Sequence, residues 1–227
     1  LERVVAVARE RGLADPVLAA PGGAAAAGPT VLVVVTSDRG LCGGFNTTMF
    51  RAVEERLRAA APGALRLAVV GRKGRDYAAT RGWPVEAVFT DVGPDANVAF
   101  ARRVTMDVLG RFARHEAARV ELLYTHFLSA LRRELTHETF LPIGAGDEGP
   151  AGTGVPAPAP AGDVLLEPGL EPILEELLPR FAVARMLAAL ADSRASEEGA
   201  RMTAMGAASK NAGELLDQLV LERNRLR

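Results

Sequence analysis

The C-terminal part of the chain carries the longest unbroken helical pattern. Residues 180–227 contain no proline, and their apolar positions keep a helical spacing to the last residue. At about 1.5 Å per residue, a helix over this stretch is roughly 70 Å long. Helices of globular domains usually end within about 20 residues, and longer patterns indicate coiled coils or repeats. We therefore expect this helix to project beyond its own domain and to lie against another element.

One apolar stripe of the predicted helix follows the alternating three- and four-residue steps of a heptad repeat. We call this stripe the seam, and it consists of Ala188, Ala191, Ala195, Met202, Met205, Ala212, Leu216, Leu219 and Leu226, interrupted by Glu198, Ser209 and Arg223. Gly199, Gly206 and Gly213 recur on a neighbouring stripe, and each costs about 1 kcal/mol of helix propensity relative to alanine. The seam and the glycines predict close approach of another element. The alternative is a solvent-exposed, alanine-rich helix.

The preceding part of the chain alternates short apolar runs with amphipathic stretches. This pattern predicts strands at 31–35, 65–70, 85–89, 120–127 and 134–141, helices at 45–60 and 97–115, and a loop with a short helix at 71–80. The inner face of the helix at 97–115 is expected to carry Val98, Val104, Val108, Leu109 and Phe112. Strand–helix alternation predicts an α/β fold with a Rossmann-like, mostly parallel sheet, whose last strand is antiparallel to the fourth.

The pattern divides the chain into four parts. We expect the end of an N-terminal helix and a linker at 1–29, with the helix at 1–13, and the α/β domain at 30–143. A flexible Pro/Ala/Gly insert and connector follow at 144–169, and the long shaft helix occupies 170–227. That helix is expected to begin after Pro172, with a kink at Pro179.

Composition limits the classes of function. The chain has 227 residues and a formal net charge of −1, so it lacks the basic footprint of a nucleic-acid-binding protein. The single cysteine, Cys42, excludes an internal disulfide and fits a reducing compartment. No stretch is apolar over the roughly 20 residues of a membrane span, and no signal peptide is visible. Because the chain begins at Leu1 and its helical pattern continues to Arg227, we expect a fragment of a longer protein.

The sharpest local motif is the turn TSDRGLCGGFN, at 36–46, between the first strand and the helix that follows it. α/β folds bind phosphates at such places through glycine amides and a helix N-terminus. However, the turn matches neither of the two common glycine-rich nucleotide motifs. The alternative is a tight turn whose glycines permit close packing. Cys42 is a candidate nucleophile beside a helix N-terminus or, alternatively, a packed thiol.

Other chemistry-bearing residues form no convincing constellation. The basic stretch at 71–75 is a candidate anion site or a solvated loop, and His115, His126 and His137 are too scattered for metal-ligand spacing. The sequence therefore predicts no catalytic residue, no cofactor and no metal.

Two long segments of the chain resemble the gamma subunit of F-type ATP synthases. The turn resembles the family pattern S/T-D-R-G-L-C-G-G-x-N, and the helical segment ASEEGARMTAMGAASKNA resembles S-E-x-x-A-R-M-x-A-M-x-x-A-x-x-N-A. The matching positions are Ser37, Asp38, Arg39, Gly40, Leu41, Cys42, Gly43, Gly44 and Asn46 in the turn, and Ser196, Glu197, Ala200, Arg201, Met202, Ala204, Met205, Ala208, Asn211 and Ala212 in the helix. Gly206 departs from the family, which often has a basic residue there, and the insert at 144–162 is not common.

The resemblance implies a rotor subunit in the central stalk of an ATP synthase. In that family, N- and C-terminal helices form an antiparallel coiled coil inside a hexamer of alpha and beta subunits. The α/β domain lies at its base, beside the epsilon subunit and the membrane rotor c-ring, and the turn lies near a lever segment of beta. The subunit binds no nucleotide and has no catalytic activity of its own, but it couples proton or sodium flow to ATP synthesis or hydrolysis by rotation. The resemblance further implies a peripheral position on the cytoplasmic face of the bacterial plasma membrane, without membrane insertion or nucleic-acid binding.

Two other functions remain open from the residues. One is a phosphate- or nucleotide-binding α/β enzyme that uses the long helix as a dimerisation arm, and the other is a plain structural scaffold. Binding of nucleotide at the turn would favour the enzyme.

Overall fold

A computed structural model of the chain describes residues 17–18, 28–92, 97–143 and 169–227. The strands are β1 (Thr30–Val35), β2 (Leu65–Val70), β3 (Val85–Phe89), β4 (Arg119–Phe127) and β5 (Arg133–Leu141). The helices are α2 (Phe45–Ala59), α3 (Arg72–Arg81), α4 (Val98–Ala113) and α5 (Leu170–Arg225). The helix expected at 1–13 and the insert expected at 144–162 lie outside the described residues.

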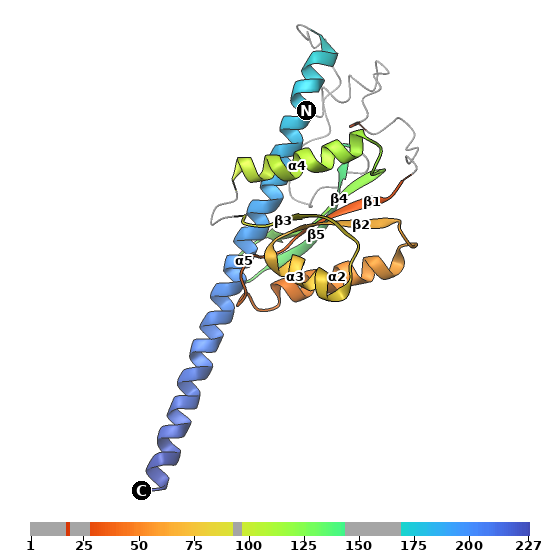
Figure 1. The fold of residues 1–227 in the computed structure, drawn as a ribbon. Coiled ribbons are helices and arrows are strands. Elements are labelled where there is room, and N and C mark those ends of the chain that lie inside the picture. The colour runs from red at the N-terminus through yellow and green to blue at the C-terminus, as the bar shows by residue number, and fades with distance from the viewer. Residues whose placement is uncertain (1–16, 19–27, 93–96, 144–168) are drawn as a thin grey trace.

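The strands form one sheet in the order β3-β2-β1-β4-β5. The first four strands are parallel, and β5 runs antiparallel to β4. Helices α2 and α3 cover one face, and α4 and α5 cover the other (Figure 1). The predicted fold class, a mostly parallel sheet with helices and a long C-terminal helix, is confirmed. Since both faces are covered, β1 is apolar without interruption from Val31 to Val35.

Alternate residues of β1 belong to two separate hydrophobic cores, because successive side chains of a strand point to opposite faces of the sheet. Leu32 and Val34 pack with Met49 and Val53 of α2. Residues of the other parity pack beneath α4 and α5. The expected inner face of α4 is correct at Val104, Val108 and Phe112, which are buried, but wrong at Val98, which is 58% exposed. Val98 is the first residue of α4, where the helix begins.

Helix α5 joins the α/β domain through a buried stripe that the sequence analysis did not identify. The stripe consists of Leu170, Leu174, Leu178, Ala182, Met186, Ala189, Leu190, Ser193, Ser196, Glu197 and Ala200. The helix begins at Leu170 and not after Pro172, because Pro172 fits a first helical turn whose amides need no intrahelical partner. Its 56 residues, with Pro179 inside the helix, correspond to about 84 Å.

The seam faces away from the buried stripe and is uncovered by the described residues. Met202, Met205, Leu216 and Leu219 are all more than half exposed, and every residue from 205 to 227 is exposed. In Figure 1 this part of α5 extends alone, well past the sheet. The projection expected from the sequence is therefore present.

Only one of the three spaced glycines of α5 contacts another described element. A Cβ added at Gly199 would lie 3.2 Å from the carbonyl oxygen of Ala130, in the connection between β4 and β5. At Gly206 and Gly213 no described atom lies within 4 Å of that position. Close approach therefore occurs at Gly199 within the chain itself, and for the other two glycines it stays a prediction.

Replacing Gly206 or Gly213 with alanine should raise the stability of the exposed part of α5 by up to about 1 kcal/mol per site, through helix propensity. Gly199→Ala should bring a smaller gain or a loss, because its methyl group meets Ala130. Amide exchange of residues 200–225 in the three variants measures the difference. Equal gains at all three positions would contradict the contact.

A buried carboxylate ties α2 to the sheet. Glu121 of β4 has a side chain only 9% exposed, and its Oε2 contacts both Arg56 of α2 and, at 2.9 Å, Nε2 of His137 of β5. Burial alone would raise the pKa of Glu121, but the hydrogen bond from His137 and the charge of Arg56 outweigh it and lower the pKa. The folded chain therefore favours the ionised carboxylate.

Because the folded-state pKa of Glu121 is depressed, its contribution to stability is present above about pH 4.5 and is lost as pH falls below that. Glu121→Gln should lower the unfolding free energy by about 1–3 kcal/mol at pH 7 and flatten its decline in acid. Urea unfolding between pH 3 and 7 measures this, with the exposed Glu55→Gln of α2 as control. An acid profile identical to the unsubstituted chain would contradict the role of Glu121.

Candidate functional site at the junction of the glycine turn and helix α5

The glycine turn, residues 37–44, leaves the carboxyl end of β1 and is held by one asparagine. Oδ1 of Asn46 accepts from the amide of Ser37 at 3.2 Å, and its Nδ2 donates to the Ser37 hydroxyl at 2.7 Å and to Sγ of Cys42 at 3.3 Å. Cys42 is 2% exposed and packs with Phe45 and with Ala200 of α5. The Cys42 thiol is therefore packed in the turn, which is the second of the two alternatives that the sequence left open for it.

Two residues of the turn have left-handed backbones. Gly43 has φ +55°, and its missing Cβ would lie 3.6 Å from the Cβ of Ala204 in α5. Leu41 has φ 62° although it is not glycine, and its side chain is 77% exposed. A leucine in this region is uncommon and strained. The conformation brings the turn against α5 and leaves an apolar side chain at the surface.

The basic stretch at 71–75 forms the first turn of α3, and its amides already have partners. The amide of Arg72 donates to Oδ1 of Asp38 at 2.9 Å, that of Lys73 to the Ser37 carbonyl, and that of Gly74 to the Thr36 hydroxyl. A Cβ at Gly74 would lie 2.6 Å from that hydroxyl oxygen. The stretch therefore fastens α3 to the turn, and these amides are occupied by the chain itself.

An ion-pair network joins the turn to α5. Glu198 of α5 pairs with Arg39 at 3.1 Å, with Arg194 at 2.8 Å and with Arg201 at 2.6 Å. Glu197, whose side chain is 5% exposed, pairs with Arg194 at 2.9 Å and also with Arg201. Arg201 further donates to the Gly40 carbonyl at 3.4 Å. Residues about 160 positions apart in the sequence therefore form one cluster.

The charges of this network stabilise one another. The hydrogen bond from Arg201, with the charges of Arg194 and Arg39, lowers the pKa of Glu198. Burial opposes the charge of Arg201, but its hydrogen bonds to Glu197 and Glu198 raise its pKa above the ordinary value. The Glu198 carboxylate and the Arg201 guanidinium are thus both favoured in their ionised forms.

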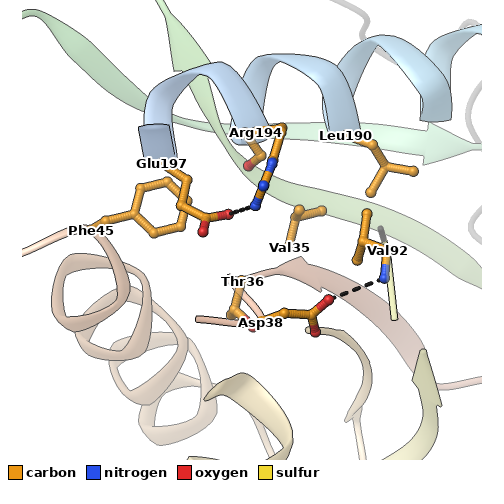
Figure 2. Close-up of a pocket in the computed structure, with 9 residues that line it drawn as sticks. Val35, Thr36, Asp38, Phe45, Val92, Leu190, Arg194 and Glu197 are labelled. Carbon is orange, nitrogen blue, oxygen red and sulfur yellow. Dashed lines mark hydrogen bonds and ion pairs between the residues drawn. The ribbon is translucent and has the colours of Figure 1, made fainter. Parts of the chain in front are cut away.

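Helix α5 also fills the crevice where doubly wound sheets usually bind ligands, at the carboxyl ends of the strands where the strand order reverses. Here that place lies between β1 and β4. The amide of Thr125 donates to Oγ of Ser193 at 3.1 Å, and Oγ of Ser196 donates to the Thr125 carbonyl at 3.2 Å. A hollow between α5 and the carboxyl end of β1 has a volume of about 20 Å³ and is lined by Val35, Thr36, Asp38, Phe45, Val92, Leu190, Ser193, Arg194 and Glu197 (Figure 2). It is large enough for about one water molecule and too small for a nucleotide.

The helical family pattern divides into two parts in the structure. Ala200, Arg201 and Ala204 contact the turn, Glu197 pairs with Arg201 within α5, and Ser196 contacts β4. The other members are exposed: Met202, Met205, Ala208, Asn211 and Ala212. The turn itself is assembled from the residues expected, and Asp38 additionally accepts from the amide of Val92 at 3.1 Å.

Several residues of the junction were not anticipated. Thr36 was included in the turn motif but was given no role. Ser193 escaped notice because a serine in a helix carries no distinctive pattern. Its one signal is its placement three residues before Ser196, on one face of an otherwise alanine-rich helix. Among the residues that the structure describes, no three His, Cys, Asp or Glu side chains are grouped as a metal site would need.

The described part of the chain therefore defines a protein whose α/β domain packs against one side of a long, projecting helix. A family model described as ATP synthase matches residues 2–227. The chain is 41% identical over 197 residues to the ATP synthase gamma chain of Moorella thermoacetica, covering 86% of this chain and 66% of the relative. It is 40% identical over 207 residues to that of Sorangium cellulosum, covering 87% and 63%. The chain belongs to the ATP synthase gamma-chain family.

Solved structures support the same fold. A chain from the central stalk and c-ring of the Tetrahymena thermophila mitochondrial ATP synthase superposes with a TM-score of 0.67 at 23% identity, covering 92% of this chain and 85% of that one. A rotor chain of the Euglena gracilis mitochondrial ATP synthase gives a TM-score of 0.63 at 18% identity, covering 100% and 87%. The chain spans slightly less than two thirds of the length of the two curated relatives above.

Removing the side chain of Asn46 should destabilise the turn, since the Ser37 amide would lose its acceptor in a buried place. We expect Asn46→Ala to lower the unfolding free energy by about 1–3 kcal/mol and to speed the reaction of Cys42 with a thiol reagent. The exposed Asn211→Ala, from the other family pattern, should change stability by less than about 0.5 kcal/mol. Denaturant unfolding and thiol labelling test both, and a silent Asn46→Ala would contradict the bonding described.

Proposed function

We propose that the chain is the central-stalk rotor subunit of an F-type ATP synthase, which couples ion flow through a membrane ring to ATP synthesis or hydrolysis. The observation that carries the proposal is the junction, where the two family patterns meet and fix the domain to the base of a projecting helix. Torque between a ring and a catalytic head requires such a rigid attachment. In this proposal the subunit performs no bond chemistry.

The exposed seam supports a second helix as the partner of α5. Met202, Met205, Ala212, Leu216 and Leu219 place an apolar stripe of heptad spacing on the projecting part. A single helix of this length, surrounded by water on every side, would leave that apolar stripe exposed and would gain no free energy from its burial. We propose that an N-terminal helix of the same subunit covers the seam as an antiparallel coiled coil, and that this shaft lies inside the alpha–beta hexamer.

The remaining partners follow from the same role. We propose that the exposed side of the glycine turn, around Leu41, meets a beta-subunit lever segment, and that the α/β domain lies beside the epsilon subunit and the c-ring. Rotation of an asymmetric shaft then shifts the populations of the three catalytic conformations, since its contacts with each differ. The ion is a proton or sodium.

The proposed location is peripheral, on the cytoplasmic face of the bacterial plasma membrane. Among the described helices, none combines the length and hydropathy that crossing a membrane requires. In this proposal, attachment to the membrane is through the ring.

A bulky residue on the seam should separate assembly from folding. Ala212→Trp should block close helix packing, since overpacking typically costs about 1–3 kcal/mol, and reduce coupled ATP-driven ion pumping roughly tenfold. Lys210→Trp adds a larger side chain off the seam and should leave coupling nearly unchanged. Circular dichroism of both variants should match the unsubstituted protein.

The measurements are copurification of alpha and beta subunits with the tagged full-length protein, and ion pumping in membrane vesicles. Loss of coupling in Ala212→Trp but not in Lys210→Trp supports the shaft. Failure of the unsubstituted protein to recover ATP synthase subunits would contradict the proposed function, as would normal coupling in Ala212→Trp.

A further inference from the structure

A histidine joins the sheet to α5 beside the serine contacts. His126, in β4, places Nδ1 at 2.5 Å from Oδ2 of Asp192 in α5, and both side chains are about one-third exposed or less. One residue before His126, Thr125 bonds Ser193 and Ser196 through its backbone. The imidazole therefore lies at the place where α5 docks on the carboxyl end of β4.

The charged groups around His126 are mostly acidic. On β5, Glu134 is its direct partner in the antiparallel register, and such cross-strand residues have neighbouring side chains. Further along β5, Glu138 pairs with Arg185 of α5 at 3.3 Å, so these two charges compensate each other. Tyr124, on the same face of β4, has a pKa raised by burial and by Glu138 and Asp192, so the phenol stays neutral. Arg133 is paired in register with Phe127 and so points to the other face of the sheet.

We propose that His126 is a proton-operated latch between the α/β domain and α5. A neutral imidazole and Asp192 form one hydrogen bond, whereas an imidazolium forms an ion pair with Asp192 and is attracted by Glu134 as well. Imidazole side chains change charge between about pH 5 and 8. Protonation therefore tightens the docking of α5, and the junction is stiffer in mildly acidic solution. This device goes beyond the rotor role and is independent of it.

Amide hydrogen exchange of the full chain tests the latch, because the Thr125 amide is bonded to Ser193 across the interface. After correction for intrinsic rates, protection of this amide should be about threefold greater at pH 5.5 than at pH 8, the scale expected for a partly exposed ion pair. The difference should disappear in His126→Gln and in Asp192→Asn.

His115→Asn is the matched control. His115 is an exposed histidine with φ 58°, a conformation that asparagine tolerates, and it lies away from α5 at the end of α4. This variant should keep the full pH difference.

The latch is overturned if the difference is missing from the unsubstituted chain or survives in His126→Gln. Should His126→Gln fail to fold, Asp192→Asn carries the same test, and survival of the difference there overturns the proposal equally. None of these measurements depends on assembly with other subunits, so the latch and the rotor function can fail separately.

Discussion

The structure depends on the packing of the first half of α5 against the sheet. Without that helix, one face of β1 and β4 would lie open beside α4, and the apolar residues of that face would meet water. Leu174, Leu178 and Met186 are each nearly inaccessible, so the helix is part of the domain core before it becomes a projection. Burial of this kind stabilises the fold by about 1.5–3 kcal/mol per large side chain. The glycine turn and the ion pairs of the junction can contact α5 only because the helix is packed in this position.

The junction uses a site that related architectures keep for ligands. Glycines, a helix start and the carboxyl ends of parallel strands all converge there, as in nucleotide-binding folds. In this chain the space is taken by Ser193, Ser196 and Glu197, and Gly43 allows Ala204 of α5 to come close to the turn. The fold is therefore the same in outline, while its crevice has become an attachment point.

The strands, the helices after them and the parallel arrangement could be predicted from the sequence, because runs such as 31–35 and 67–70 are apolar without interruption. The resemblance of two motifs also identified the family. The docking stripe of α5 was missed, since alanines occur on every side of the helix and the seam alone stood out. Arg39 and Glu198 are too far apart in the sequence for periodicity to predict their contact. A role for His126 could be inferred only once the structure placed it beside Asp192.

Helix α5 passes from the core into solvent without a break, and different constraints limit the substitutions that its two halves tolerate. Substitutions in the first half are limited by the chain's own folding, which any stability measurement can detect. In the second half, beyond Ala204, a substitution can leave folding intact and still be harmful if, as proposed, a partner helix covers that surface. Variation among natural sequences should therefore be limited by folding in the first half of the helix and by contacts with a partner in the second half. The change should fall near the edge of the sheet.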